Sequence, residues 1–451
     1  MKLCTTFINK LPRQMVRLGL LIISCVFVAQ VRGQEIVIDV SKTSSNSPEG
    51  AVAAGLESLC PTLQNQTPSD PGQQQLQAVC NALDFASPEQ LASAYRALSA
   101  RTNTSETSAA TNGPVGLPSD GIGKRLAALR KAAASTTKPN LAWQDRDELG
   151  ALDSATGGGA SADTTDGKLS GFVTVDSISS RQDENKWVAG FKGALLGILA
   201  GADYRFRDTV FGGLALRYAN SDIDIAKIGG SAKAKDWNAI LYSTFFASQH
   251  WNLDMAAHYG MVKFNLDRNI NFAFPGQDIN EVSNSSSDGK QYGLRLGSGY
   301  EWVIGSGWVT QALADVSFNR FKIDSYTESS STGFNLNIKE QTIDSLKLNL
   351  GAQLNKAFGF TWGVLIPQLN FAWVNEYITD GQKIQASFVS DPTNTQFRYT
   401  TNPKPDNFTI GSLGLASVFP GGMTAFINYA KYLDYKYYNQ YTVSVGIRME
   451  L

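Results

Sequence analysis

The sequence predicts an all-β fold, a 12-stranded antiparallel transmembrane β-barrel over 169–451, preceded by a small α-helical domain and a linker helix in or near the pore. Two observations carry this prediction. Charged residues make up 18% of the chain, a low share for a soluble surface, whereas aromatic residues make up 10%. Long C-terminal segments also alternate apolar and polar residues, and side chains alternate between the two faces of a strand. A β-sandwich shows the same alternation, so composition alone leaves both architectures open.

The last segment of the chain, 441–451, alternates most regularly. Its apolar positions are Tyr441, Val443, Val445, Ile447, Met449 and Leu451. Rows that contain Asp, Lys, Arg or Glu oppose similar apolar rows in 251–261, 289–304 and 341–356. Such a row would destabilise the dry core of a sandwich. In a membrane barrel it faces a hydrated lumen while the apolar row faces lipid, so the pattern favours the barrel.

Twelve strands account for the C-terminal part. They are expected at 170–178, 190–206, 209–222, 235–248, 251–267, 289–304, 307–324, 341–356, 361–377, 407–419, 422–433 and 440–451. Short connections such as 207–208 and 420–421 alternate with long ones at 268–288, 325–340 and 378–406. Bacterial barrels have even strand numbers, short periplasmic turns and longer extracellular loops. Both ends of the barrel are therefore expected in the periplasm, and 383–398 is expected as an extracellular hairpin.

The N-terminus predicts a signal peptide over 1–33. Basic residues from Lys2 to Arg17 precede an apolar run at 18–29, which is too short to span a membrane permanently. Cleavage is expected after about Gly33. The residues around Cys25 also resemble a lipoprotein box, so lipid attachment there stays open.

Residues 34–100 predict a small helical domain. Apolar residues recur at helical spacing in 48–60 and 73–83, and Ser87 followed by Pro88 is typical of the start of a third helix. Cys60 and Cys80 are the two cysteines outside the signal peptide. In an exported protein they predict a disulfide, which stabilises by about 3 kcal/mol, mainly through the unfolded state.

Residues 101–168 predict a flexible linker that is rich in Ser, Thr, Gly and Asp and contains a basic helix at 121–134. Ile122, Leu126 and Leu129 share one face of this helix. The pattern fits a solvated helix as well as a helix that occupies the lumen of the barrel, and the two alternatives stay open.

From about residue 120 onward, several segments resemble the translocator domain of autotransporters, the proteins of type V secretion. The segment 201–206 (GADYRF) and the following 211–214 (FGGL) resemble strands of that family, as do Pro367 with 371–373 and Gly446 with 447–448. The basic helix resembles the linker helix that precedes the family's barrel, through Lys124, Arg125, Leu126, Leu129 and Arg130.

The resemblance implies a barrel that exports its N-terminal passenger and is inserted by the outer-membrane barrel assembly machinery. This machinery reads the terminal strand, here 441–451, which in the family usually ends in Phe or Trp and here ends in Leu451. Self-cleaving members carry paired Asn residues before the barrel. Residues 101–168 hold only single ones, Asn103, Asn112 and Asn140, so a retained passenger is expected.

Charge and histidine content narrow the function classes. A net charge of -1 provides no polybasic footprint for nucleic acid. Both histidines, His250 and His258, fall in the barrel, so the helical domain cannot build a Ser–His–Asp site or a His-based zinc site. We therefore expect no enzyme, no cofactor and no metal. The lumen charges, including Arg217, Arg295, Glu301 and Arg448, are expected to pair with each other or to line a hydrated pore.

Two functions follow from the sequence. The first is an outer-membrane barrel, in contact with lipid, that exports or displays its short N-terminal region at the cell surface. The second is a structural or plugged-pore barrel whose N-terminal domain stays in the periplasm. The sequence does not identify a surface partner.

Overall fold

The computed structural model describes residues 47–101, 103, 168–226, 229–274, 276–305, 307–401 and 406–451. All of them belong to one compact unit, Asp39–Leu451. The predicted signal peptide, the possible lipid attachment at Cys25, the single Asn112 and Asn140, and the predicted linker helix lie outside the described residues.

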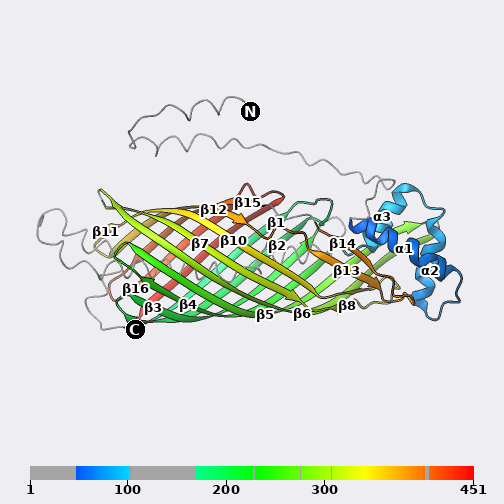
Figure 1. Ribbon diagram of the computed structural model, residues 1–451, viewed down its shortest axis with the longest axis horizontal. Coiled ribbons are helices and arrows are strands. Elements are labelled where there is room, and N and C mark those ends of the chain that lie inside the picture. Colours follow the sequence, from blue (N-terminus) through cyan, green and yellow to red (C-terminus); the bar gives the residue numbers. More distant parts are fainter. Residues whose placement is uncertain are drawn as a thin grey trace, which may run out of the picture. The chain divides into compact units, whose positions relative to one another are not determined.

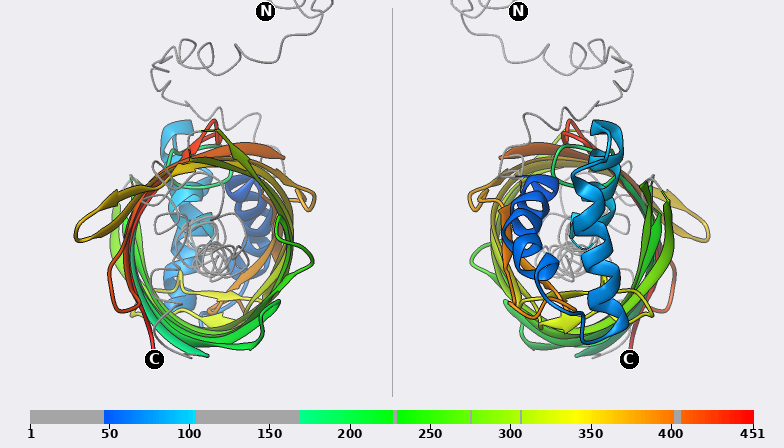
Figure 2. Two further views of the ribbon diagram at one scale, coloured as in Figure 1. Left: turned by 90° about the vertical axis from the view of Figure 1, so that its left-hand side faces the viewer. Right: turned by 90° about the vertical axis from the view of Figure 1, so that its right-hand side faces the viewer.

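Twelve long antiparallel strands close into a barrel, as predicted (Figure 1; Figure 2, left). They are β1 Leu169–Gln182, β2 Phe191–Arg207, β3 Val210–Ile225, β4 Gly230–Phe246, β5 Trp251–Phe274, β6 Gln277–Ile304, β7 Trp308–Ile323, β10 Gln341–Lys356, β12 Gly363–Glu376, β15 Asn407–Val418, β16 Met423–Leu433 and β17 Tyr438–Glu450. Pairing of β1 with β17 closes the ring, and the short β11, Phe358–Phe360, pairs with β12 next to the turn.

The connections define two ends of the barrel. Lys168 and Leu451 lie at the proximal end, where short turns such as 208–209 and 419–422 join the strands. The long connections 183–190, 324–340 and 377–406 lie at the opposite, distal end. The expected long loop over 268–288 is wrong, because β5 and β6 continue through it and pair up to Phe274 and Gln277.

The extension of β5 follows from a reversal of its polarity pattern. In the first half, Trp251, Leu253 and Met255 face outward, whereas Asn252 and Asp254 face the lumen. Beyond Val262 the outward positions become polar and the inward positions apolar, although the alternation itself does not break. The outward residues there include Lys263, Asn265 and Asp267, and the inward ones include Phe264, Leu266, Ile270, Phe272 and Phe274. The distal half of β5 is therefore built like a strand of a water-soluble protein, with its apolar face inside.

Three helices, α1 Pro48–Gln64, α2 Pro71–Leu83 and α3 Pro88–Leu98, confirm the predicted helical domain; we call residues 47–101 the cap. Each helix begins with Pro at its first position behind a side chain that accepts a backbone N–H, namely Ser47, Asp70 and Ser87. Ser87 and Gln90 form a full capping box, as the sequence around Pro88 suggests. None of the described helices has the length and apolar character needed to cross a membrane.

The cap packs at the distal end of the barrel (Figure 1; Figure 2, right). A four-stranded sheet joins it there, made of β8 Tyr326–Thr327, β9 Leu336–Ile338, β13 Lys383–Phe388 and β14 Phe397–Thr400. Helix residues such as Leu56 and Leu76 share one apolar core with Phe264 of β5, Phe334 before β9 and Phe388 of β13. The hairpin expected at 383–398 is therefore present, and it helps to enclose the cap.

Candidate functional site: the lumen and the junction of cap and barrel

The lumen of the barrel carries the charged side chains that the sequence placed there, and several of them are paired. Arg217 Nη1 donates to Asp236 Oδ2 at 2.8 Å, and Asn238 and Gln291 donate to the same oxygen at 2.7 and 3.2 Å. Arg295 donates to Asp315 at 2.9 Å. Oppositely charged partners and amides thus line the lumen wall, although Asp236 and Asp315 were not singled out from the sequence.

Glycines in the GADYRF and FGGL segments make room for large lumen side chains. A Cβ at Gly201 would lie 2.7 Å from Phe172 Cζ, and a Cβ at Gly213 would lie 2.4 Å from the Tyr242 ring. The Tyr242 hydroxyl donates to Asp203 at 2.5 Å. Phe172 and Tyr242 thus occupy the space beside the glycines of the two segments, and Asp203 of the first segment ties β2 to β4.

The terminal strand β17 presents its predicted apolar row on the outer surface. Tyr441, Val445, Ile447, Met449 and Leu451 are exposed on the described chain. The backbone N–H of Leu451 donates to the carbonyl of Leu169 at 2.9 Å, which continues the ladder between β17 and β1. On the other face of the same strand, Arg448 donates to Glu450 at 2.9 Å.

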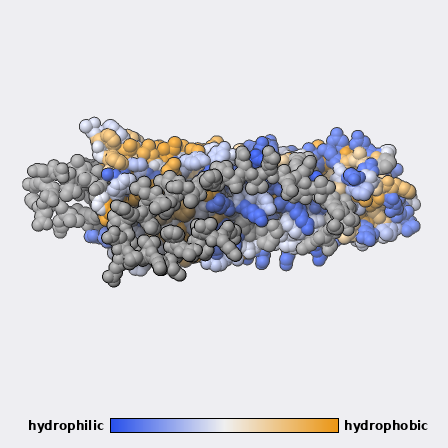
Figure 3. Space-filling view, turned by 90° about the horizontal axis from the view of Figure 1, so that it is seen from above, coloured by the Kyte–Doolittle hydropathy of each residue, from blue (hydrophilic) through white to orange (hydrophobic). Residues whose placement is uncertain are grey.

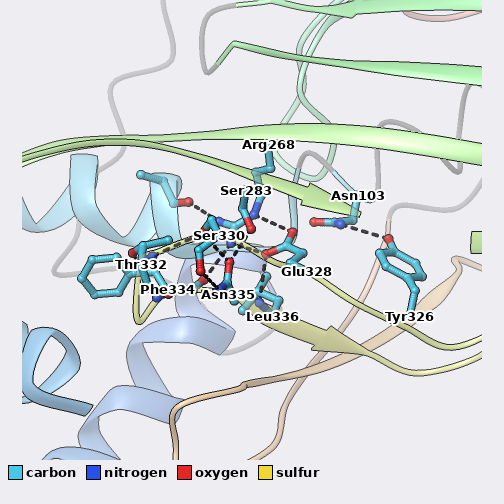
Figure 4. A network of polar contacts seen from close by, with 11 residues as sticks. Asn103, Arg268, Ser283, Tyr326, Glu328, Ser330, Thr332, Phe334, Asn335 and Leu336 are labelled. Atoms are coloured by element: carbon cyan, nitrogen blue, oxygen red, sulfur yellow. Dashed lines mark hydrogen bonds and ion pairs between the residues drawn. The ribbon is translucent and has the colours of Figure 1, made fainter. Parts of the chain in front are cut away.

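The junction between cap and barrel centres on Arg268, which sequence analysis missed (Figure 4). Its guanidinium binds the Glu328 carboxylate in bidentate form, with Nε–Oε1 at 2.8 Å and Nη2–Oε2 at 2.6 Å. It also donates to the carbonyl of Ala97 near the C-terminus of α3, at 2.8 Å. Both charged side chains are buried, at 0% and 1% exposure.

This arrangement satisfies both charges. A cation at a helix C-terminus is favourable, because the last carbonyl groups of a helix have no partner within it. Glu328 Oε2 accepts a further hydrogen bond from the backbone N–H of Leu336 at 2.9 Å, and Arg268 donates to the carbonyl of Phe334 at 2.8 Å. One arginine thus holds β5, the β8–β9 connection and the cap together. Removing one member of such a buried pair leaves an uncompensated charge and costs about 3–5 kcal/mol.

A second buried arginine, Arg101, ties the end of the cap to the β1–β2 connection. Its Nη1 donates to Glu49 of α1 at 2.8 Å, and its Nη2 lies 3.1 Å from Glu184 Oε1. It also donates to the carbonyls of Asn185 and Val188. Both arginines of the junction, Arg101 and Arg268, thus form ion pairs and hydrogen bonds to backbone carbonyls.

The backbones of the cap and of the barrel connections approach each other closely at the junction. A Cβ at Gly333 would lie 2.1 Å from the carbonyl oxygen of Gly72 at the start of α2, so a larger residue does not fit. The backbone N–H of Gly333 donates to Gln75 Oε1 at 2.7 Å. The Tyr399 hydroxyl of β14 donates to the carbonyl of Ala100 at 3.0 Å, and Asn103 donates to the Tyr326 hydroxyl at 2.9 Å.

Within the cap, Cys60 and Cys80 form the predicted disulfide and join α1 to α2 across a sequence separation of 20 residues. The predicted linker residues Lys124, Arg125, Leu126, Leu129 and Arg130 lie outside the described part of the chain. Among the described residues, no group of three or more His, Cys, Asp or Glu side chains is placed to hold a metal.

Comparison with known proteins agrees with the architecture. The autotransporter beta-domain family matches residues 171–430. The translocator domain of the autotransporter NalP from Neisseria meningitidis is similar over 78% of this chain and 99% of its own, with 15% identity and a TM-score of 0.53. The beta domain of the Bordetella autotransporter BrkA aligns over 63% of this chain and 100% of its own, with 14% identity and a TM-score of 0.45. No curated protein sequence matches the chain.

Proposed function

The chain belongs to the autotransporter family, whose barrels reside in the outer membrane and export a passenger domain, and on this premise we propose that its passenger is its own helical cap, held at the cell surface after export. The single observation that carries the proposal is the position of the cap. It packs at the distal end of the barrel, opposite Lys168 and Leu451, where the long connections lie. In outer-membrane barrels the longer connections are extracellular.

The connectivity of the chain supports export. Asn103 contacts Tyr326 at the distal end, whereas β1 begins at the proximal end with Leu169. Residues 104–167 therefore connect the two ends of the barrel. This connection is in keeping with the resemblance of residues 124–130 to the family's linker helix. The alternative, a plugged pore with its helical domain in the periplasm, is not favoured by the family match.

The contacts of the cap support retention rather than release. Its core is shared with barrel residues, so release of the cap would expose apolar side chains that the cap, β5 and the small sheet now bury together. Burying one such side chain stabilises by about 1.5–3 kcal/mol. We therefore propose a display function, in which the cap is an anchored surface domain and the barrel does not act as an enzyme.

Epitope insertion tests the export of the cap. A tag after Thr67, in the exposed turn between α1 and α2, should be detected by antibody on intact cells. A matched tag after Asp208, in the β2–β3 turn at the proximal end, should be detected only after the outer membrane is permeabilised. Detection of the Thr67 tag only after permeabilisation would place the cap in the periplasm and overturn the proposal.

We further propose that the outward row of β17 is the signal read by the barrel assembly machinery. Leu451 and Leu169 are both exposed, apolar and adjacent at the proximal end, so they form a matched pair. Leu451→Asp should lower the amount of assembled barrel in the outer membrane, whereas Leu169→Asp should not. Both variants should refold in detergent without the machinery. Equal losses in cells would show that apolarity at this edge matters and that the terminal residue has no special role.

A further inference from the structure

We propose that four outward-facing lysines on β4–β7, just distal to the lipid-facing surface, bind the phosphate groups of lipids in the outer leaflet. This lysine row consists of Lys235, Lys263, Lys290 and Lys322. The proposal rests on the proposed function, because it requires the distal end of the barrel to face outward.

The first step places the edge of the lipid. Outward apolar residues on β5 run from Trp251 to Met261, ten residue steps apart. At about 3.3 Å per residue and a tilt of about 40°, this stretch spans roughly 25 Å along the membrane normal, the height of the apolar band of outer-membrane barrels. The next outward residue of β5 is Lys263, which therefore lies at the level of the outer headgroups. The aromatic residues Tyr218, Trp237, Tyr259 and Tyr292 border the band on the same face.

The strand register then gathers the lysines into one row. Lys235 of β4 lies directly opposite Lys263 of β5, and Lys290 of β6 lies directly opposite Lys322 of β7. Lys290 pairs with Met261, so it stands diagonal to Lys263. Directly opposite side chains have Cβ atoms about 5 Å apart and diagonal ones about 7–8 Å apart. The four lysines thus extend over roughly 15 Å, across four neighbouring strands.

The acidic residues beside the row do not balance it. Lys322 Nζ binds Glu340 at 3.0 Å, and Asp288 stands opposite Lys263 without an ion pair in the structure. The neighbouring Arg320 is already bound to Asp344, at 2.6 and 2.7 Å. Lys235, Lys263 and Lys290 form no ion pair with any described residue. The outward Asp222 of β3 is diagonal to Lys235, but it stands directly opposite a further outward lysine, Lys233.

Like charges directly opposite each other destabilise a sheet. The two adjacent lysine pairs therefore lower the stability of the barrel unless an anionic ligand binds beside them. Phosphate groups at the headgroup level supply the complementary charge, and lysine is a suitable point-charge ligand for them. On the other side of the barrel, outward basic residues have acidic neighbours or stand apart. Lys192 of β2 faces Asp224 as well as Arg181, which is paired with Asp183, and Lys431 of β16 faces Gly411 and Tyr441. The structure thus assigns the phosphorylated lipid to the β4–β7 face.

Figure 3 shows one face of the molecule, on which hydrophobic residues gather over the part of the barrel away from the cap and hydrophilic residues lie nearer to it. On β4–β7, the lysine row lies where the outward residues of the strands change from apolar to polar. A lipid whose chains cover Met261 and Tyr259 can therefore place its phosphate beside Lys263 and Lys290.

Native mass spectrometry of the refolded full-length chain tests the proposal. The probes are bisphosphorylated lipid A, monophosphoryl lipid A and phosphatidylethanolamine. Wild-type affinity should fall in that order. The triple variant K235Q/K263Q/K290Q should bind bisphosphorylated lipid A roughly 10- to 100-fold more weakly, because each basic residue near an anionic headgroup contributes several-fold in affinity.

A matched triple variant, K192Q/K431Q/K436Q, removes the same charge from other outward positions at the distal rim and should stay within about twofold of wild type, because these lysines lie outside the row. Wild-type affinity that does not depend on the number of phosphates would overturn the proposal, and this measurement needs no variant to fold. So would equal losses in the two triple variants, which would indicate a diffuse charge effect. Because lipid binding is measured on refolded protein, its failure is independent of the outcome of the Thr67 tag experiment.

Discussion

The proximal and distal halves of the barrel use the same strands in opposite senses. In the proximal half the outer surface is apolar and the lumen carries ion pairs such as Arg217–Asp236. In the distal half the outer surface is polar and the inside is an apolar core shared with the cap. On β5 the change occurs between Met261 and Lys263, without a break in the strand. Which face of a strand is apolar therefore depends on whether that face contacts lipid, water or the core shared with the cap.

The largest expected effect comes from breaking the ion pair in the distal core. Arg268→Leu should lower the free energy of unfolding of the distal region by about 3–5 kcal/mol, because Glu328 is left charged and buried. The double variant Arg268→Leu/Glu328→Leu should recover part of that loss. Hydrogen exchange of α3 and β5 in the full chain measures both.

A matched control exists on the outer surface, where Arg320 binds Asp344 with both side chains partly exposed. Arg320→Leu should cost at most about 1 kcal/mol, because exposed ion pairs contribute little. A loss as large as that of Arg268→Leu would contradict the view that burial distinguishes the two pairs.

One substitution made in each half tests the polarity reversal directly. Ala257 and Asn265 both face outward on β5. Ala257→Arg should destabilise the barrel by about 2–4 kcal/mol, because it places a charge against the middle of the lipid layer. Asn265→Arg, in the polar half, should change stability by less than about 0.5 kcal/mol. Urea titration of the lipid-embedded barrel measures both, and similar costs would show that the lipid edge lies elsewhere.

Removal of the disulfide tests whether the cap can lose stability independently of the barrel. Cys60→Ser/Cys80→Ser should destabilise the cap by about 3 kcal/mol, because the unfolded segment between the cysteines regains its freedom. The proximal half should keep its stability, because neither cysteine contacts it. Hydrogen exchange of α1 and α2, compared with that of β2 and β3, measures the difference.

The smallest effect concerns pH. Burial, and to a lesser extent Glu57, raises the pKa of Tyr95 in α3. The folded cap therefore holds the phenolic proton more tightly than the unfolded chain, so this contribution is complete below the unfolded pKa and is lost as pH rises through the folded pKa. Cap stability should fall in alkaline solution, and Tyr95→Phe should reduce that fall. An unchanged pH profile in the variant would assign the dependence to other groups.

The sequence predicts most of the barrel correctly, because apolar and polar residues alternate within each lipid-facing strand, as in 441–451. This alternation can be recognised without knowledge of the neighbouring strands. It also predicts the three helices and the disulfide, since helix starts at Ser87 and Pro88 and a single cysteine pair are local signals. The sequence pattern does not predict the distal part of β5 as a strand with the same apolar face, because its apolar residues change from the outer face to the inner face. The segment 263–274 alternates just as regularly, with the apolar residues on the other face.

By itself, the sequence determined the strand number, the orientation of apolar and polar rows in the proximal half, and the helical nature of the N-terminal part. These depend on neighbours along the chain or on the surrounding solvent. The sequence alone does not show that the cap completes the distal core, that Arg268 joins α3 to Glu328, or that four lysines from four strands form one row. These depend on the register between strands and on contacts between residues far apart in the chain, such as Ala97 and Arg268, which the sequence pattern of either segment does not encode.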